Sequence, residues 1–415
     1  MIRKLIGSEF FKASFWVFLA TGVLNAGNYF YHLIMGRMLG PQEYGVLESV
    51  ISLFYIISIP FVPLTLVIVK FVSSYKGKQD RVAIASFYSY MKDKVLIYGL
   101  IATVVLLISS PLIMSFLHLS NIYFPILISL GFFVGLLAML VKGTLQGLFN
   151  FFALFVANTV EIAIKVIVAM SLVYLGFKAL GAVFAVTASF LVGFIIAFFF
   201  LKKEKFGGKS NFKEGKEILK YSVPVFLTSL GLTSLFTTDI ILVRNLFSGV
   251  ESGYYAALSV LGKIIFFGTF PVTIVLFPLV SERHAASKDY RNLLLISVVL
   301  TLVIAGLILG IYYFFPQEMV DLLFGEKFSK ISPLLAIFGV FIAIYSLSSL
   351  LANFYLSIHK TIISIFVILA SFLQILLIFF FHKSLLEVIY MSIISTSLLL
   401  LLLIIYYPFA IGKKN

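Results

Sequence analysis

The sequence contains no cysteine and few charged residues. None of its 415 residues is Cys, and only 12% are Asp, Glu, Lys or Arg, whereas soluble proteins carry about 25%. The lack of cysteine excludes disulfides, iron–sulfur clusters and thiol catalysis. The shortage of charge, with 61% hydrophobic residues and a mean hydropathy of +1.13, indicates a polytopic membrane protein.

Long apolar runs predict twelve membrane-spanning helices. A span needs about 20 mostly apolar residues, and several charge-free windows reach that length. The uncharged run 95–141 is twice as long and is interrupted by "HLSN" at 118–121, so it predicts two spans. The predicted helices are 13–35, 46–69, 94–117, 122–142, 153–175, 179–201, 221–243, 255–280, 292–315, 332–357, 361–381 and 386–409.

Basic residues predict the orientation of these helices. With a cytoplasmic N-terminus, 23 of the 31 Lys and Arg residues fall on the inner side and six on the outer side. The remaining two, Lys165 and Lys263, lie inside spans. This is a strong positive-inside signal and predicts that both termini are cytoplasmic. It also accounts for most of the net charge of +14, so we expect no nucleic-acid partner.

The second half of the chain repeats the first. At an offset of 208 residues, 10 of the 31 positions in 43–73 are identical, including Glu43 with Glu251 and Gly45 with Gly253. An even number of helices per copy makes both copies enter the membrane in the same sense, as in parallel-repeat transporters. We therefore predict lobes at 1–201 and 221–415, joined by a charged cytoplasmic linker at 202–220. A pseudo-two-fold axis along the membrane normal would relate them.

Prolines and glycines recur at matching places in both copies. Gly40-Pro41 is expected to end one helix before Gly45 begins the next. Pro63 and Pro271 are matched at the same offset and are predicted inside helices, where each would free a carbonyl and bend the helix. A repeated bend suits either a hinge or simple packing curvature.

Several stretches resemble polysaccharide flippases of the multidrug/oligosaccharidyl-lipid/polysaccharide transporter superfamily. They are "GRMLGPQEYGVLESVISLFYIISIP", "LKYSVPVFLTSLGLTSLFTTDIILVRNLFSGVESGYYAALSVLGKI", "VLFPLVSE", "KGTLQGLFNF" and "YLGFKALGAVFA". The resemblance covers residues from about 5 to 290 and fades over the last four helices. It implies an all-α, V-shaped carrier with two six-helix lobes, like that of MATE multidrug exporters. It also implies transport of polyprenyl-diphosphate-linked oligosaccharides from the inner to the outer leaflet.

An anionic diphosphate cargo needs cations inside the membrane. Intramembrane charges cost about 2.5–3.5 kcal/mol each on insertion scales, so they mark candidate sites. Lys263 either faces a wet cavity and meets phosphate, or snorkels or forms a structural pair. Lys165 either contacts phosphate or pairs with Glu161 at i, i+4. The candidate cations that would contact the substrate are Lys263, Lys165, Arg37, Arg244 and Lys142. The alternative for Lys142 is a charge that only marks the inner side of the membrane. The alternative for the two arginines is a structural role at the outer junctions between helices.

Three acidic residues are candidates for coupling to H+ or Na+. Asp239 lies near the end of a predicted helix, five residues before Arg244, and could instead pair with that arginine or with Arg37. Glu161 could exchange an ion if its helix faces the cavity. Glu48 has no acidic counterpart in the second copy, where Ala256 stands. Burial disfavours the charged form of such acids, which suits an ion-coupled step.

Two other functions are weighed against the flippase. A MATE-type multidrug or cation antiporter on the same fold would need acidic groups for cationic drugs, whereas the candidates here are mixed and lean basic. A membrane-embedded polymerase or ligase would need a large outer loop with Arg and His, but the longest predicted outer loop, 316–331, has no histidine. We expect a monomeric cytoplasmic-membrane transporter without metal or cofactor, acting among membrane lipids and other polysaccharide assembly proteins.

Overall fold

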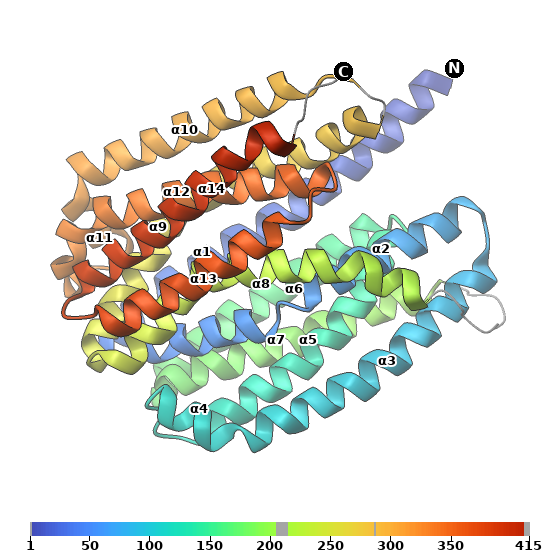
Figure 1. The fold of residues 1–415 in the computed structure, drawn as a ribbon. Coiled ribbons are helices and arrows are strands. Elements are labelled where there is room, and N and C mark those ends of the chain that lie inside the picture. The colour runs from blue at the N-terminus through green and yellow to red at the C-terminus, as the bar shows by residue number, and fades with distance from the viewer. Residues whose placement is uncertain (1, 205–214, 286–287, 411–415) are drawn as a thin grey trace. The chain divides into compact units, whose positions relative to one another are not determined.

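The computed structural model describes residues 2–204, 215–285 and 288–410, and every regular element in these ranges is a helix (Figure 1). Side chains at the start of the first helix, up to residue 21, are not among the described ones, nor are those of 215–222. The predicted linker 202–220 therefore lies mostly outside the described residues. The chain forms two compact units, which are taken in turn.

Unit 1 comprises Met1–Leu39 and Pro60–Ser222. Its centre is α5, which packs against α2, α3 and α7. Gly143 and Gly147 of α5 lie against Ile68 and Val72 of α2, so small residues allow the two backbones to approach closely. The elements are the first part of α1 (Ile2–Ile57), α2 (Phe61–Gly77), α3 (Arg81–Ile108), α4 (Ser110–Phe116), α5 (Tyr123–Gly147), α6 (Phe151–Leu172), η1 (Val173–Phe177) and α7 (Lys178–Lys202).

Unit 2 comprises Gly40–Ile59 and Val223–Asn415. Its centre is α12, which packs against α9, α10 and α14. The elements are the last part of α1, α8 (Gly215–Leu246), α9 (Gly249–Ala285), α10 (Arg291–Phe314), α11 (Pro316–Leu323), η2 (Glu326–Ile331), α12 (Ser332–Ser357), α13 (Ile363–Phe380) and α14 (Leu385–Ala410). Helix α10 exposes large apolar side chains, including Leu307 and Leu295, as expected of a helix in contact with lipid.

The boundary between the units differs from the predicted lobe boundary at one place. By its contacts, the segment Gly40–Ile59 belongs to unit 2, although it precedes most of unit 1 in the sequence. The break falls at Gly40, whose φ of 71° is left-handed and favours glycine. This segment brings Glu48 and its neighbours into the unit that also contains α8 and α9.

Each of the twelve predicted segments coincides with a helix or with a broken pair of helices. The predicted helix 46–69 is interrupted by a turn at 58–60, between α1 and α2, and 94–117 is interrupted at Ser109, between α3 and α4. The expectation that Pro63 lies in a helix interior is wrong. Pro63 lies in the first turn of α2, where a missing N–H costs nothing. Pro271 lies inside α9 and is exposed.

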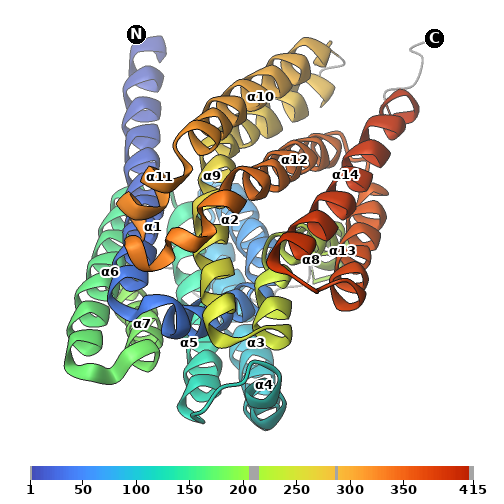
Figure 2. The same ribbon diagram turned by 90° about the vertical axis from the view of Figure 1, so that its left-hand side faces the viewer.

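Helices α6 and α7 form an antiparallel hairpin, visible as a pair joined by a short turn in Figure 2. Ala153 and Ala157, near the start of α6, cluster with Ala197 and Leu201, near the end of α7. Among the described residues, eight helices are long and apolar enough to span a membrane, or ten when each bent pair is one span. That count treats α6, η1 and α7 as one helix of 52 residues, whereas their packing indicates two passes.

The parts of the two copies around Gly45 and Gly253 meet inside unit 2. A side chain at Gly45 would lie 2.5 Å from the Ser252 hydroxyl and 2.7 Å from the backbone N of Gly253. A side chain at Gly253 would overlap the carbonyl of Pro41. Gly45 and Gly253 are the residues matched by the 208-residue offset, so equivalent glycines of both copies form one close helix crossing.

This crossing predicts a selective glycine requirement. We expect Gly253→Ala to lower the melting temperature of the purified protein in detergent, because the new methyl group meets backbone atoms that cannot move aside. Gly306→Ala is the matched control, since nothing lies within 4 Å of a side chain at that position in α10. Equal melting temperatures for the two variants would contradict the close crossing.

Candidate functional site

Apart from Arg244, the buried charged side chains among the described residues form one cluster in each unit. The unit 1 cluster consists of Lys142, Glu161 and Lys165, and the unit 2 cluster consists of Glu48, Asp239 and Lys263. All except the partly exposed Lys142 are less than 9% exposed. Because uncompensated charge in a membrane is costly, the partners of each group define what the cluster can do.

Lys165 is held on α6 by two side chains of α1. Its Nζ donates a hydrogen bond of 2.9 Å to Oδ1 of Asn28 and lies 4.0 Å from the centre of the Tyr31 ring. Tyr31 is itself fixed, since its hydroxyl donates to the carbonyl of Ala182 on α7 at 3.0 Å. The ring face stabilises the ammonium group by a cation–π interaction. Two side chains of α1 therefore hold the ammonium group of Lys165 in place.

Glu161 pairs with a lysine from a neighbouring helix. Its Oε2 lies 2.5 Å from Nζ of Lys142 on α5. A side chain at Gly193 of α7 would collide with the Glu161 carboxylate, so this glycine makes room for the pair. We expected Glu161 to pair with Lys165 one turn away. The structure joins Glu161 to Lys142 and Lys165 to Asn28 instead.

Lys263 lies at the centre of the unit 2 cluster. Fourteen residues into α9, it is 6% exposed, and its Nζ lies 4.4 Å from the centre of the Phe236 ring of α8. Phe236 stacks on Tyr345 of α12, with ring centres 5.0 Å apart. Lys263 also interacts electrostatically with Asp239 and Glu48. Lys263 is therefore a buried cation within electrostatic range of two carboxylates.

Asp239 begins a chain of buried polar groups. Its Oδ2 accepts a hydrogen bond of 2.9 Å from the Tyr255 hydroxyl, and Tyr255 also bonds Ser392 of α14. Ser392 in turn accepts a bond of 3.0 Å from the amide of Gln374 on α13. Four helices thus contribute to one polar path through the core of unit 2. The Oε1 atom of Gln374 is buried and has no hydrogen-bond partner.

Arg37 and Arg244, the two arginines among the candidate cations, have different surroundings. Arg37 is exposed on the part of α1 that belongs to unit 1. Arg244, in the last turn of α8, is 7% exposed; it donates to the Ser252 hydroxyl at 3.2 Å and interacts with Glu43. Glu251 forms a capping box with Ser248 at the start of α9. Arg244 and Glu251 therefore have structural partners at this corner.

The two clusters have opposite charge balance. With every group ionised, the unit 1 cluster has two lysines and one carboxylate, whereas the unit 2 cluster has one lysine and two carboxylates. The first is therefore suited to an anionic ligand, and the second to a proton or small cation. Among the described residues, no three His, Asp or Glu side chains form a metal-binding group.

Sequence reasoning missed the aromatic and hydroxyl partners of these charges. Tyr31, Phe236 and Tyr255 were not candidates, although each contacts a buried charged group. Tyr255 precedes Lys263 by eight residues, a spacing that keeps both near one face of α9. That spacing was the available signal. For Tyr31 no signal exists, because its contact with Lys165 joins residues more than 130 positions apart.

Comparison with known sequences matches most of the chain to one family. The profile of the family described as "Polysaccharide biosynthesis protein" matches residues 34–333. A membrane protein of Methanocaldococcus jannaschii, itself uncharacterised, is 25% identical over 324 residues, which is 74% of this chain and 75% of that protein.

Solved structures show the same fold. An inward-facing multidrug resistance MATE family transporter has a TM-score of 0.75 at 16% identity, covering 93% of this chain and 96% of that one. The lipid II flippase MurJ in an inward closed conformation also scores 0.75, at 15% identity, covering 95% and 87%. A MOP superfamily transporter from Pyrococcus furiosus has a TM-score of 0.67 at 16% identity, covering 98% of this chain and 96% of that one. The all-α membrane fold expected from the sequence is thereby confirmed.

The unit 2 cluster predicts non-additive effects on stability. We expect Lys263→Met to lower the melting temperature in detergent, because it removes the cation beside Glu48 and Asp239; breaking a buried pair costs about 3–5 kcal/mol. Adding Asp239→Asn should restore much of the loss, since the second change removes the uncompensated charge. The exposed Lys330 gives the control variant Lys330→Met. Simple addition of the two losses would contradict the pairing.

Proposed function

Because the chain belongs to the polysaccharide biosynthesis protein family, we propose that it is a flippase that moves a polyprenyl-diphosphate-linked oligosaccharide across the cytoplasmic membrane. Family membership supports a role in surface polysaccharide synthesis, and the fold is one that MATE transporters and a lipid II flippase also have. Such a protein moves its cargo and does not alter it chemically. It is therefore a transporter rather than an enzyme.

The observation that carries the proposal is the cationic excess of the unit 1 cluster. A diphosphate is anionic and must lose water to enter a membrane protein, so it needs buried cations that are already in place. The ammonium group of Lys165 is already oriented by the amide of Asn28 and the ring of Tyr31. The Lys142 side chain of α5 is 20% exposed and pairs with the carboxylate of Glu161 on α6. A phosphate oxygen would take the place of that carboxylate.

Ion coupling is assigned to the unit 2 cluster. Its two carboxylates share one lysine, so binding of a proton or Na+ at Asp239 or Glu48 would complete the charge balance. Tyr255 holds Asp239 at a fixed position, and the path to Gln374 connects it to α13 and α14. After the ion leaves, the positive charge of Lys263 would lower the free energy of the two ionised carboxylates. A transporter that alternates between inward and outward states can use such an exchange to drive export.

The proposed membrane location follows from the predicted topology and from the proposed cargo. The basic residues favour a cytoplasmic membrane location with both termini inside, where the lipid-linked sugar is assembled. We propose that the protein acts as a monomer, among membrane lipids and other polysaccharide assembly proteins. Arg37 and Arg244 remain candidate cations at the corners, and Pro271 remains a candidate hinge within α9.

Charge reversal tests the cationic site. Lys165→Glu should abolish export of the lipid-linked sugar, by at least about 100-fold, because it replaces attraction of phosphate by repulsion in a poorly screened environment. Lys263→Glu should also abolish export, by placing a third carboxylate in the unit 2 cluster. The control Lys327→Glu changes an exposed lysine in η2. Normal export by a membrane-inserted Lys165→Glu protein would contradict the assignment.

The two carboxylates of the unit 2 cluster also favour a second candidate function. A cation antiporter of the MATE type binds positively charged drugs, and Glu48 with Asp239 could supply the acidic groups. Complementation of a flippase-deficient strain separates the two functions. The flippase predicts rescue, with loss of the lipid-linked sugar that accumulates in the inner leaflet. Drug resistance without that rescue would favour the antiporter.

Ion coupling gives a further prediction. In proteoliposomes, transport by the unaltered protein should depend on an imposed H+ or Na+ gradient. Asp239→Asn should abolish that dependence, because the neutral amide can neither bind a proton nor supply charge to Na+. Glu318→Gln, at an exposed position of α11, is the control that removes a carboxyl group elsewhere in the same unit. Gradient-driven transport by Asp239→Asn at the normal rate would refute the coupling role.

A further inference from the structure

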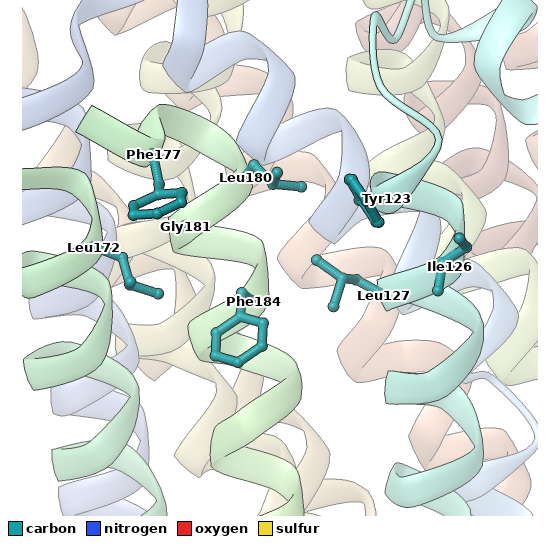
Figure 3. Close-up of a pocket in the computed structure, with 8 residues that line it drawn as sticks. All are labelled: Tyr123, Ile126, Leu127, Leu172, Phe177, Leu180, Gly181 and Phe184. Atoms are coloured by element: carbon teal, nitrogen blue, oxygen red, sulfur yellow. The ribbon is translucent and has the colours of Figure 1, made fainter. Parts of the chain in front are cut away.

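A cavity in unit 1 and the polar path in unit 2 differ in the groups that they offer. The cavity has a volume of about 450 Å³ and an apolar exposed lining, to which α5 contributes Leu127 and α7 contributes Phe184 (Figure 3). Such a wall can neither bind nor release a proton. The polar path runs from Gln374 through Ser392 and Tyr255 to the carboxylate of Asp239. It is therefore the feature that can respond to a proton.

The hydrogen bonds along the polar path all point toward Asp239. The amide nitrogen of Gln374 donates to Oγ of Ser392 at 3.0 Å. Because that oxygen accepts, its own hydrogen is available to donate to Tyr255, which is the next link. The Tyr255 hydroxyl donates to Oδ2 of Asp239 at 2.9 Å. A row of donors that ends on a carboxylate is the arrangement expected when Asp239 is ionised, since an ionised carboxylate only accepts.

The groups around the Asp239 carboxylate favour a proton over a metal ion. Oδ1 accepts a bond of 2.9 Å from the backbone N–H of Ile240, and Oδ2 accepts from Tyr255. Lys263 of α9 acts electrostatically on the same carboxylate, and Glu48 of α1 acts on that lysine. Hard metal cations take oxygen ligands, whereas these partners present hydrogens and a positive charge to Asp239. A proton can join Oδ2 once the Tyr255 hydroxyl turns away.

The side-chain oxygen of Gln374 gives the polar path a second arrangement. Gln374 is fully buried, and its Oε1 has no hydrogen-bond partner among the described residues. A buried acceptor left unpaired costs free energy. Meanwhile Nε2 makes two bonds, to Ser392 and to the carbonyl of Leu235 on α8. A half-turn of the amide would exchange its two ends and place Oε1 against the Ser392 hydroxyl.

We propose that H+ is the coupling ion and that Gln374 is a positioning residue whose amide turns over when Asp239 binds the proton. The proton on Oδ2 makes Asp239 a donor to Tyr255. The Tyr255 hydroxyl then donates to Ser392, and the Ser392 hydroxyl donates to Oε1 of Gln374. The proton stays on Asp239, and only the two hydroxyls and the amide change direction. This inference rests on the ion coupling proposed above and names its ion.

The turn of the amide would change the contact between α8 and α13. These helices lie close together, since a side chain at Gly231 of α8 would lie 2.9 Å from the backbone carbonyl carbon of Val367 on α13. The bond of 3.3 Å from Gln374 to the carbonyl of Leu235 also joins them. After the half-turn two acceptors would face each other there, so this link would be lost. Proton binding would thereby bias the helix packing that alternating access changes.

Infrared difference spectroscopy tests the inference in the full-length protein, reconstituted in vesicles without cargo. Lowering the pH should produce a carboxyl band that is absent from Asp239→Asn. It should also shift a glutamine amide band, identified by carbon-13 labelling of glutamine. The amide shift should be lost in Gln374→Met and kept in Gln317→Met, the control at an exposed position of α11.

Two serines of α14 test the link between Asp239 and Gln374. Ser392→Ala removes the middle of the polar path, so Asp239 should still take up a proton while the amide shift is lost. Ser395→Ala is the matched control, because the Ser395 hydroxyl donates to carbonyls of its own helix; both signals should persist. An amide shift that survives in Ser392→Ala would overturn the inference.

Export measurements separate this inference from the proposed function. Gln374→Met should slow export driven by a pH gradient at least about tenfold, a typical coupling between sites, although Asp239 still takes up its proton. An amide band that ignores pH, or that responds to Na+ at constant pH, would overturn the inference and leave the flippase function standing. A normal amide shift in a protein that exports no lipid-linked sugar would support the inference and refute the function.

Discussion

The structure depends on how two buried lysines are compensated within the membrane. Lys165 and Lys263 each lie over an aromatic ring from a different helix, at 4.0 and 4.4 Å from its centre. Beyond that ring, Lys165 has an amide, whereas Lys263 has two carboxylates within electrostatic range. Carboxylates near an ammonium group weaken its attraction for a further anion, whereas an amide or an aromatic ring does not cancel its charge. This difference separates the proposed cargo site from the proposed coupling site.

The helices could be predicted from the sequence, but the partners of the charged residues could not. Each predicted apolar segment coincides with a helix or a broken pair of helices. Gly40-Pro41 marked a real break, because only glycine adopts that left-handed conformation readily. Helical spacing suggested that Glu161 pairs with Lys165, yet Lys142 on α5 reaches Glu161 across the bundle. Such contacts depend on which helices are neighbours, and periodicity along one helix does not contain that information.

The segment after Gly40 shows how a duplicated chain can acquire different chemistry in its two copies. Gly45 and Gly253 occupy the same place in the repeat and pack against each other. One turn beyond, the copies diverge, with Glu48 in the first and Ala256 in the second. Because Gly40–Ile59 packs in unit 2, the extra carboxylate joins Asp239 and Lys263. The first copy of the repeat therefore supplies an acidic group to the other unit.

A structure of the protein with a bound polyprenyl-diphosphate sugar tests the central assignment most directly. The account predicts that the diphosphate contacts Nζ of Lys165 and of Lys142, with Glu161 displaced from its present 2.5 Å contact. Asp239, Tyr255 and Lys263 would then keep their mutual contacts and touch no phosphate. A diphosphate bound at Lys263, with the unit 1 cluster unchanged, would contradict the account.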